Sequence, residues 1–325
     1  MPSYKSYNVD HKQLEFNKRV QRASYIGGVS MKRKIYQADA FTSSVYCGNP
    51  AAVVLDAAGL TDMQMQLIAS EMKLSETAFV FPGTALYDYE VRFFTPAAEV
   101  DLCGHATIAA FYVMKKAGLI APSKKAVFQK TKAGILSVKF EECGRVMMRQ
   151  AEPLKIGGKI AAEGLCEIMG INKSNIGIAN LMALPEMWST GLSDIILPVR
   201  SVEALKNMVP FMDRLAEYSR KMDAVGVHAF AIDENNTVWC RNFAPLYGIS
   251  EEAATGTANG ALGACLYEKG WHRDRDGNLF FCAHQGEWMN RPSEIVVEVS
   301  GGDKPEVWGG GDAVIVLEGE IVVGE

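Results

Sequence analysis

The sequence predicts an α/β protein that consists of two similar halves. Three observations support this prediction. Short apolar and β-branched runs recur along the chain, two helical segments are apolar on every side, and three short motifs occur twice in the same order. The chain has 325 residues, a length that suits two domains of ordinary size. We therefore expect a first domain over residues 31–150 and a second over residues 151–325.

A polar segment precedes these two domains. Residues 1–30 contain charged side chains throughout and no continuous apolar stretch. They therefore lack the apolar core that a secretory signal requires. The β-rich pattern begins abruptly at residues 34–36. We expect residues 1–30 to form a polar N-terminal extension.

Several of the apolar runs alternate with a period of two, which is typical of strands with one face in a core. The expected strands are residues 51–55, 77–81, 89–93, 135–140, 195–199, 294–299 and 313–317. Residues 61–73 instead follow a helical pattern, with Thr61 at the N-cap position.

Two further helices are expected at residues 106–117 and 258–268. Both segments are rich in small residues and apolar on all sides. A helix of this kind is normally buried, and in a strand-rich chain it would lie inside a sheet or barrel.

The internal repeat relates the two halves. The first half contains Thr-Ala-Phe-Val at 77–80, Arg-Phe-Phe-Thr-Pro at 92–96 and Gly-His-Ala-Thr-Ile-Ala at 104–109. The second half contains His-Ala-Phe-Ala at 228–231, Arg-Asn-Phe-Ala-Pro at 241–245 and Gly-Thr-Ala-Asn-Gly-Ala at 256–261. The motifs share a common frame at nearly equal spacing, which indicates a duplicated domain.

Each copy ends in a glycine turn, at Gly104 and Gly256, where a buried helix is expected to begin. The first backbone N–H groups of a helix have no partners within it, and together with the helix dipole they attract anions. Two such turns on one cleft would hold a small carboxylate. Alternatively, both glycines only permit close packing of the helices.

Composition excludes several other classes of protein. The formal net charge is -5 and the pI about 5.7, which argues against nucleic acid as the main partner. No apolar stretch is long enough to span a membrane. The seven cysteines lack CxxC pairs, so we expect reduced thiols in a cytosolic protein.

No cofactor is expected. The histidines and cysteines show neither zinc-finger spacing nor a HExxH motif, and we therefore predict no metal, although ligands from distant segments can still meet in space. Residues 309–311 are three glycines ahead of a strand, which indicates a turn rather than a phosphate loop. The sequence contains no dinucleotide-binding or P-loop pattern.

Seven motifs together resemble the PhzF family, named after phenazine biosynthesis. They are D-A-F-T at 39–42, G-N-P-A-A-V-V at 48–54, L-S-E-T-A-F at 74–79, R-F-F-T-P at 92–96, D-L-C-G-H-A-T at 101–107, E-A-A-T-G-T-A at 252–258 and Q-G-E-W-M-N-R-P-S at 285–293. The resemblance extends from residue 31 to about residue 325. It implies a diaminopimelate-epimerase-like fold of two pseudo-symmetric α/β domains, each an antiparallel sheet curled around a central helix. It also implies an active site between the domains and a homodimer.

The resemblance also assigns roles to residues. The glutamate of the S-E-T motif, Glu76, corresponds to the family's proton shuttle, and the motif histidine to His105. Thr257 corresponds to a small hydroxyl residue after the second loop glycine. Glu252 stands where the family usually has aspartate, which keeps the charge and lengthens the side chain by one methylene. Ser75, Gly104 and Gly256 complete the expected substrate-binding residues.

Local chemistry agrees with these roles. Glu76 lies at the edge of an apolar strand, where burial would raise its pKa and make it a better base toward carbon. His105 directly follows a helix-start glycine, so we expect a neutral imidazole that donates a hydrogen bond to a developing oxyanion. The alternatives are a surface glutamate at a strand end and a histidine that only caps its own loop.

The sequence thus predicts a cofactor-independent isomerase or epimerase that transfers a proton on a small carboxylate bound between the domains. Two alternatives remain. Cys103 occupies the first thiol position of the related racemases, but the matching position in the second repeat is Thr255, which cannot act as a thiol base. The other alternative is a non-catalytic protein that binds small acids on the same scaffold.

Overall fold

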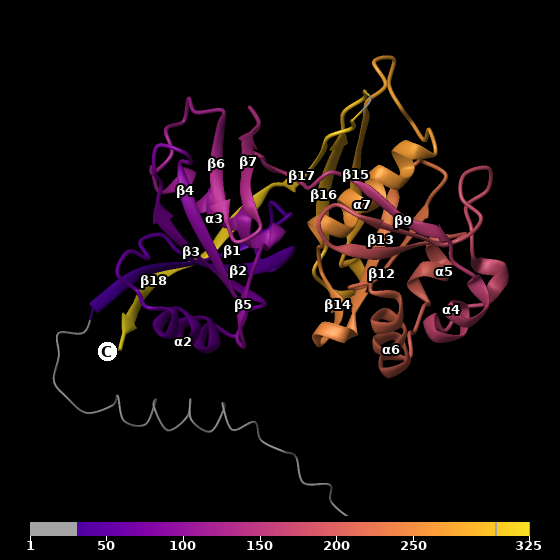
Figure 1. Cartoon of the computed structure of the whole chain (residues 1–325), viewed down its shortest axis with the longest axis horizontal. Coiled ribbons are helices and arrows are strands. Elements are labelled where there is room, and N and C mark those ends of the chain that lie inside the picture. Colours follow the sequence, from indigo (N-terminus) through magenta and orange to yellow (C-terminus); the bar gives the residue numbers. More distant parts are fainter. Residues whose placement is uncertain (1–30, 303, 325) are drawn as a thin grey trace, which may run out of the picture.

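The computed structural model describes residues 31–302 and 304–324, so the predicted extension at residues 1–30 lies outside the described residues. Figure 1 shows two lobes, with the first half of the chain in one and most of the second half in the other. The strands are β1 (Met31–Ala40), β2 (Asn49–Val54), β3 (Glu76–Pro82), β4 (Tyr89–Phe94), β5 (Glu99–Val100), β6 (Ala126–Thr131), β7 (Gly134–Phe140), β8 (Val146–Arg149), β9 (Leu154–Lys159), β10 (Glu186–Ser189), β11 (Ser193–Pro198), β12 (Gly226–Ile232), β13 (Val238–Ala244), β14 (Ile249–Glu252), β15 (Leu279–Gln285), β16 (Ser293–Val299), β17 (Val307–Gly311) and β18 (Ala313–Val323).

Helices are fewer than strands, as the sequence predicts. They are α2 (Asp62–Met72), α3 (Gly104–Lys116), α4 (Ala162–Met169), α5 (Val202–Lys206), α6 (Met212–Met222) and α7 (Gly256–Glu268), with single 3₁₀ turns at η1 (Lys173–Asn175), η2 (Pro245–Tyr247) and η3 (Glu287–Met289). The expected N-cap of α2 is confirmed. The Thr61 hydroxyl accepts from the Gln64 backbone, and the Gln64 side chain accepts from the Thr61 backbone.

The strand pairing repeats in the two halves. In the first, β2 pairs parallel with β3, β3 antiparallel with β4, β4 parallel with β6, and β6, β7 and β8 follow antiparallel. In the second, β11, β12, β13, β15, β16 and β17 pair in the same order and directions. The predicted duplication is therefore confirmed. The expected antiparallel sheet is in fact mixed, because each copy contains two parallel pairs.

The two copies are connected through their strands. β8 pairs with β17, and β18 pairs along its whole length with β1. The predicted boundary at residue 150 separates the two sets of strands up to β17, but the final strand β18 lies with the first set, as Figure 1 shows. The domain ranges otherwise remain a prediction.

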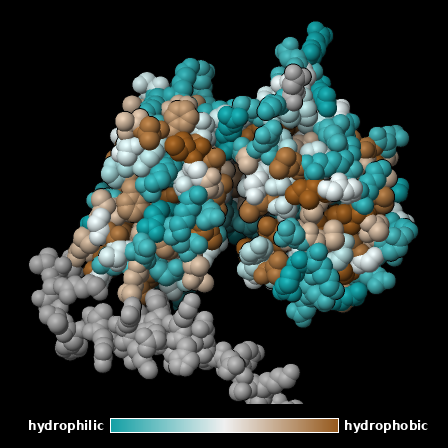
Figure 2. Space-filling model, in the orientation of Figure 1, coloured by the Kyte–Doolittle hydropathy of each residue, from teal (hydrophilic) through white to brown (hydrophobic). Residues whose placement is uncertain are grey.

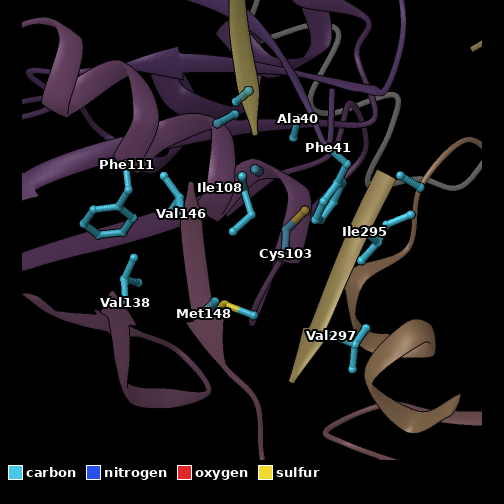
Figure 3. Close-up of a cluster of buried hydrophobic side chains, with 14 of the residues drawn as sticks. Ala40, Phe41, Cys103, Ile108, Phe111, Val138, Val146, Met148, Ile295 and Val297 are labelled. Carbon is cyan, nitrogen blue, oxygen red and sulfur yellow. The ribbon is translucent and has the colours of Figure 1, made fainter. Parts of the chain in front are cut away.

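Each half wraps its strands around one central helix. α3 packs against β1, β2, β3, β8 and β18, while α7 packs against β10, β11, β16 and β17. Buried residues of both helices belong to one hydrophobic cluster that spans the halves. Figure 3 shows part of this cluster, with Phe41 and Cys103 between the first-half ribbon and the strand that carries Ile295 and Val297. The surrounding strands account for the helices being apolar on every side.

The turn predicted at residues 309–311 is wrong, because these three glycines belong to β17. A Cβ on Gly310 would lie 2.1 Å from the carbonyl oxygen of Val146, and one on Gly309 would lie 2.3 Å from the side chain of Gln150. The glycines therefore allow the neighbouring strand and side chain to come close, which a larger residue would prevent.

All seven cysteines are free thiols, as the sequence predicts. Within residues 31–302 and 304–324, no helix has both the length and the apolar character needed to cross a membrane. Figure 2 shows a hollow between the two lobes on the face that is drawn.

Candidate functional site

The two central helices begin at the same place. A Cβ built on Gly104 would lie 4.0 Å from the Cα of Gly256, so the first turns of α3 and α7 face each other. In these two helices, which are described throughout, neither N-cap residue, Cys103 or Thr255, makes a side-chain capping bond, and no acidic residue lies in the first turn. Their backbone N–H groups and positive dipole ends therefore converge on one point, which favours a bound anion.

Glu76 and His105 form a close pair beside these helix starts. Glu76 is the first residue of β3, and His105 is the second residue of α3. The His105 Nε2 lies 3.1 Å from the Glu76 carboxylate and also 3.1 Å from the Ser75 hydroxyl. The side chain of Glu76 is 15% exposed and that of His105 only 5%. The pair is thus mostly shielded from water, while the carboxylate keeps some access to the outside.

Glu252 approaches the same imidazole from the second half of the chain. Its carboxylate lies 3.8 Å from the His105 Nδ1, on the side of the ring opposite Glu76. The other Glu252 oxygen accepts a hydrogen bond of 2.7 Å from the Thr255 hydroxyl. The longer side chain at this position therefore reaches the site, and the two halves together place a carboxylate on each side of one imidazole.

Asn49 links the two halves at this point. Its amide nitrogen lies 3.0 Å from Glu252 Oε1, 2.9 Å from the Ala254 carbonyl oxygen and 3.2 Å from His105 Nδ1. An amide group has only two hydrogens. When they serve the two oxygens, the remaining polar neighbour of the His105 Nδ1 is the Cys103 sulfur, 3.5 Å away. The other ring nitrogen, Nε2, lies 3.1 Å from both the Glu76 carboxylate and the Ser75 hydroxyl, so polar groups from both halves of the chain surround the imidazole.

Electrostatics shift the pKa values of Glu76 and His105 in opposite directions. Burial raises the pKa of Glu76, but the His105 charge and hydrogen bonds from His105, Ser75 and Cys103 outweigh burial, so its pKa lies below the ordinary value. Burial lowers the pKa of His105, whereas Cys103 and Glu76 raise it well above the ordinary value. Burial raises the pKa of the Cys103 thiol to about 11, so this group is uncharged at neutral pH and Glu76 is the partner that matters.

Two sequence-based expectations are therefore wrong. The pKa of Glu76 is lowered rather than raised, and the pKa of His105 is raised rather than lowered. Both errors have one cause, because the sequence does not show that the two side chains meet. For Glu76, the charge of His105 and three hydrogen bonds outweigh burial, and for His105 the neighbouring Cys103 and Glu76 outweigh it. For Glu252, by contrast, burial prevails over His105, Thr255 and Asn49 and raises the pKa.

A polar network inside the second half holds the loop of Glu252. The buried Gln285 donates to the Glu252 carbonyl oxygen at 2.8 Å and to the Thr255 hydroxyl at 3.1 Å. Its side-chain oxygen accepts from the Thr255 backbone and from Asn259. Because these bonds fix both ends of the loop, they orient Glu252 toward His105.

The start of α7 is fixed in a similar way. Gln150 donates to the Gly256 carbonyl oxygen at 2.8 Å, and Thr190 donates to that of Thr257 at 3.0 Å. Thr257 lies in the first turn of α7 and is buried. Within the described part of the chain, no hydrogen bond joins its side chain to Glu76, His105 or Glu252. Thr257 thus lies at the start of α7, next to Gly256, without a hydrogen bond from its side chain to these three residues.

Sequence reasoning missed the roles of Asn49 and Gln285. Both residues belong to motifs that resemble the family, G-N-P-A-A-V-V and Q-G-E-W-M-N-R-P-S. An asparagine next to a proline indicates a turn, and a glutamine carries no catalytic signature of its own. Their importance follows from partners far away in the sequence, since Asn49 and Glu252 are separated by 203 positions.

Comparison with known proteins identifies the family. The model of the family described as phenazine biosynthesis-like protein, PhzC-PhzF, matches residues 38–319. The chain belongs to this family. An uncharacterized isomerase of Clostridium acetobutylicum is 38% identical over 90% of this chain and 99% of its own length. A crystal structure of a PhzF-family phenazine biosynthesis protein from Bacillus anthracis is 30% identical, with a TM-score of 0.81 over 90% of this chain and 100% of that one.

The fold extends beyond the family. A hydroxyproline epimerase from Agrobacterium vitis, solved with trans-4-hydroxy-L-proline, superposes with a TM-score of 0.61 over 90% of this chain and 93% of that one. The two sequences are 12% identical, so this likeness concerns the fold alone. The diaminopimelate-epimerase-like fold implied by the motifs is confirmed.

Proposed function

We propose that this protein is an isomerase or epimerase that moves a proton on a small carboxylate substrate. The observation that supports this proposal most directly is the Glu76–His105 pair, mostly shielded from water, beside two uncapped helix starts. Relatives named as isomerases agree with it, and so does the fold shared with an epimerase.

The substrate carboxylate would bind where α3 and α7 meet. The first turns of both helices, at Gly104 and Gly256, lie next to each other at this place, and both helix dipoles favour a negative charge there. The substrate carbon then lies against Glu76, with Ser75, Glu252 and Thr257 orienting the remaining groups. The site joins residues from both halves, so a substrate held in it is enclosed between them.

Glu76 would transfer the proton in two steps. Its carboxylate first takes a proton from a substrate carbon, and the electron pair of the C–H bond moves toward the adjacent carbonyl or carboxylate group. The His105 imidazolium donates a hydrogen bond to the oxygen on which negative charge develops. Glu76 then returns the proton to another carbon or to the opposite face. The proton count balances on Glu76 alone, and the proposed reaction therefore consumes no cofactor.

Substrate binding would also adjust the basicity of Glu76. In the free protein, His105 holds the pKa of this carboxyl low. When His105 turns its Nε2 hydrogen bond toward a substrate oxygen, Glu76 loses the interaction that offsets its burial. Its affinity for a proton then rises at the moment when it must take one from carbon.

Hydrogen exchange with solvent tests this function. Candidate carboxylic acids (amino acids, cyclic acids and unsaturated acids) are incubated with the full-length protein in deuterated water and followed by NMR. We expect deuterium at one carbon of a bound acid, and Cys103→Ser should retain that exchange. Binding of an acid with no exchange would indicate a non-catalytic binding protein. Loss of exchange in Cys103→Ser but not in Glu76→Gln would instead support the thiol-dependent reaction.

A further inference from the structure

Glu76, Cys103 and His105 bring three different metal-ligating atoms to one point. A carboxylate oxygen, a sulfur and an imidazole nitrogen all lie within 4.8 Å of one another. The His105 Nε2 is 3.1 Å from the Glu76 Oε2 and 3.8 Å from the Cys103 Sγ. Two segments separated by more than twenty positions supply these atoms, so no ligand-spacing motif marks them in the sequence.

These distances fit the edges of a tetrahedral metal centre. With bonds of about 2.0 Å to nitrogen and oxygen and about 2.3 Å to sulfur, the ligand atoms of tetrahedral zinc are roughly 3.3–3.6 Å apart. The two measured separations lie on either side of this range, within a few tenths of an ångström. The third separation, between the Glu76 carboxylate and the Cys103 Sγ, is no more than 4.8 Å, and side-chain rotations would shorten it to the same range when one ion is bound. A mixed set of oxygen, nitrogen and sulfur ligands suits zinc and similar borderline metals rather than magnesium or calcium.

Burial and charge also favour such an ion. Cys103 is 8% exposed and His105 4% exposed, and the buried Glu76 Oε2 lacks a hydrogen bond of good geometry within the described residues. A divalent cation with one thiolate, one carboxylate and one neutral imidazole has no net charge. A neutral centre avoids most of the desolvation penalty that a buried charge otherwise incurs.

The remaining carboxylate does not belong to this ligand set. Glu252 faces Nδ1, the other ring nitrogen, at 3.8 Å, and is held by Asn49 and Thr255. The centre would therefore have three protein ligands and one open position for water, which is the arrangement of an exchangeable zinc site rather than a closed structural one.

We propose that Glu76, Cys103 and His105 form a binding site for Zn²⁺ or a similar thiophilic divalent cation. On binding, the Cys103 thiol and the Nε2 of His105 each release a proton to solvent, and the cation takes their place. If Glu76 and His105 have the roles proposed above, the filled site cannot transfer protons, and the cation is a reversible inhibitor. The inhibition rests on the proposed function, whereas the binding site itself does not.

Cobalt binding tests the site without any substrate. The full-length protein, freed of metal by dialysis against a chelator, is titrated with Co²⁺, whose bond to a thiolate produces a charge-transfer absorption. We expect one Co²⁺ per chain with this absorption, and displacement by Zn²⁺. Cys103→Ser should abolish the absorption. Because loss of a partner outside the ligand sphere already weakens metal sites by about 10–100-fold, Glu76→Gln should weaken binding at least about tenfold while the absorption remains.

A matched control uses a thiol outside the cluster. Cys143 is exposed and lies on the surface of the first half, so Cys143→Ser should bind Co²⁺ like the wild type. Should Cys103→Ser not fold by circular dichroism, His105→Gln provides a second ligand variant. An absorption that persists in Cys103→Ser, an absorption lost in Cys143→Ser, or no absorption in the wild type would each overturn the proposal. None of these outcomes bears on solvent exchange, so the two proposals fail independently.

Discussion

Glu76 and His105 behave as one unit at the residue scale. Burial alone would favour the neutral form of each side chain. Each side chain instead shifts the pKa of the other toward the charged form. The Glu76 carboxylate, a proton acceptor, lies 3.1 Å from the His105 Nε2, which can donate a hydrogen bond. This arrangement allows a proton to be taken and an adjacent negative charge to be stabilised in the same site.

Asp194 differs from Glu76 in that its pKa is raised rather than lowered. It lies near the start of β11, is 2% exposed, and its Oδ1 lacks a hydrogen-bond partner among the described residues. Burial, with a smaller contribution from the negative charge of Glu252, raises its pKa to about 8. The folded protein therefore holds this carboxyl neutral in a pH range where the unfolded chain ionises it.

Asp194→Asn is expected to change how stability depends on pH. Because the folded pKa is raised, the contribution of Asp194 is fully present below the unfolded value of about 3.9 and is lost as the pH rises toward 8. The amide variant keeps the shape without titrating, so it should gain stability relative to wild type between pH 4 and pH 8. One pKa unit corresponds to about 1.4 kcal/mol, and we expect a gain on the order of a few kcal/mol at pH 8.

Urea unfolding at several pH values measures this gain. The exposed Asp56 provides the control, since Asp56→Asn makes the same substitution on the surface and should keep the stability within about 0.5 kcal/mol of wild type. A constant difference between Asp194→Asn and wild type from pH 4 to pH 8 would show that Asp194 is ionised in the folded state as well.

At the scale of elements, the two central helices determine where the site lies. α7 contains glycines on the side that faces the strands, and a Cβ on Gly263 would lie 2.5 Å from the Val297 side chain on β16. This close contact keeps α7 within its sheet and its first turn next to α3. The position of the site thus depends on a packing contact two turns away from it.

Gly263→Ala should therefore destabilise the fold. The added methyl group overpacks the core, and we expect a loss of about 1–3 kcal/mol in the free energy of unfolding. Gly164 in α4 is a matched control, because it is exposed and nothing lies within 4 Å of its Cβ position. There alanine should stabilise the helix by about 0.5–1 kcal/mol. Chemical denaturation of both variants checks the pair, and wild-type stability of Gly263→Ala would refute the packing argument.

The elements also show what the sequence could and could not predict. The seven expected strand segments and both central helices were predictable because their apolar pattern depends on local sequence alone. α6 was not predicted, since its eleven residues are mostly polar and only Leu215 and Ser219 are buried. The three glycines of β17 were predicted to form a turn. They are required because β8 and Gln150 come close to this strand, and that contact exists only in the folded chain.

The candidate site was also predictable only in part. Repeated motifs and the family resemblance pointed to Glu76, His105 and Glu252, and the structure places these three side chains together. The charges of Glu76 and His105 were not predictable, because they follow from a distance between segments that are far apart in sequence. Asn49 and Gln285 escaped notice for the same reason.

At the scale of the whole molecule, duplication explains why the site lies where it does. Two copies of one strand order face each other, connected by β8 with β17 and by β1 with β18. Each copy contributes a helix start and a carboxylate to the junction, while the imidazole comes from the first copy alone. The duplicated fold is thus symmetric in its backbone and asymmetric in its chemistry.

The most direct test of this account is the rate at which Glu76→Gln exchanges a substrate hydrogen with deuterated water. Glutamine keeps the size of the side chain but cannot take a proton, so exchange should fall by a factor on the order of 10²–10⁴ while substrate binding persists. Glu76→Asp, which changes only the reach, should retain part of the rate. Exchange by Glu76→Gln at nearly the wild-type rate would contradict the central claim that Glu76 transfers the proton.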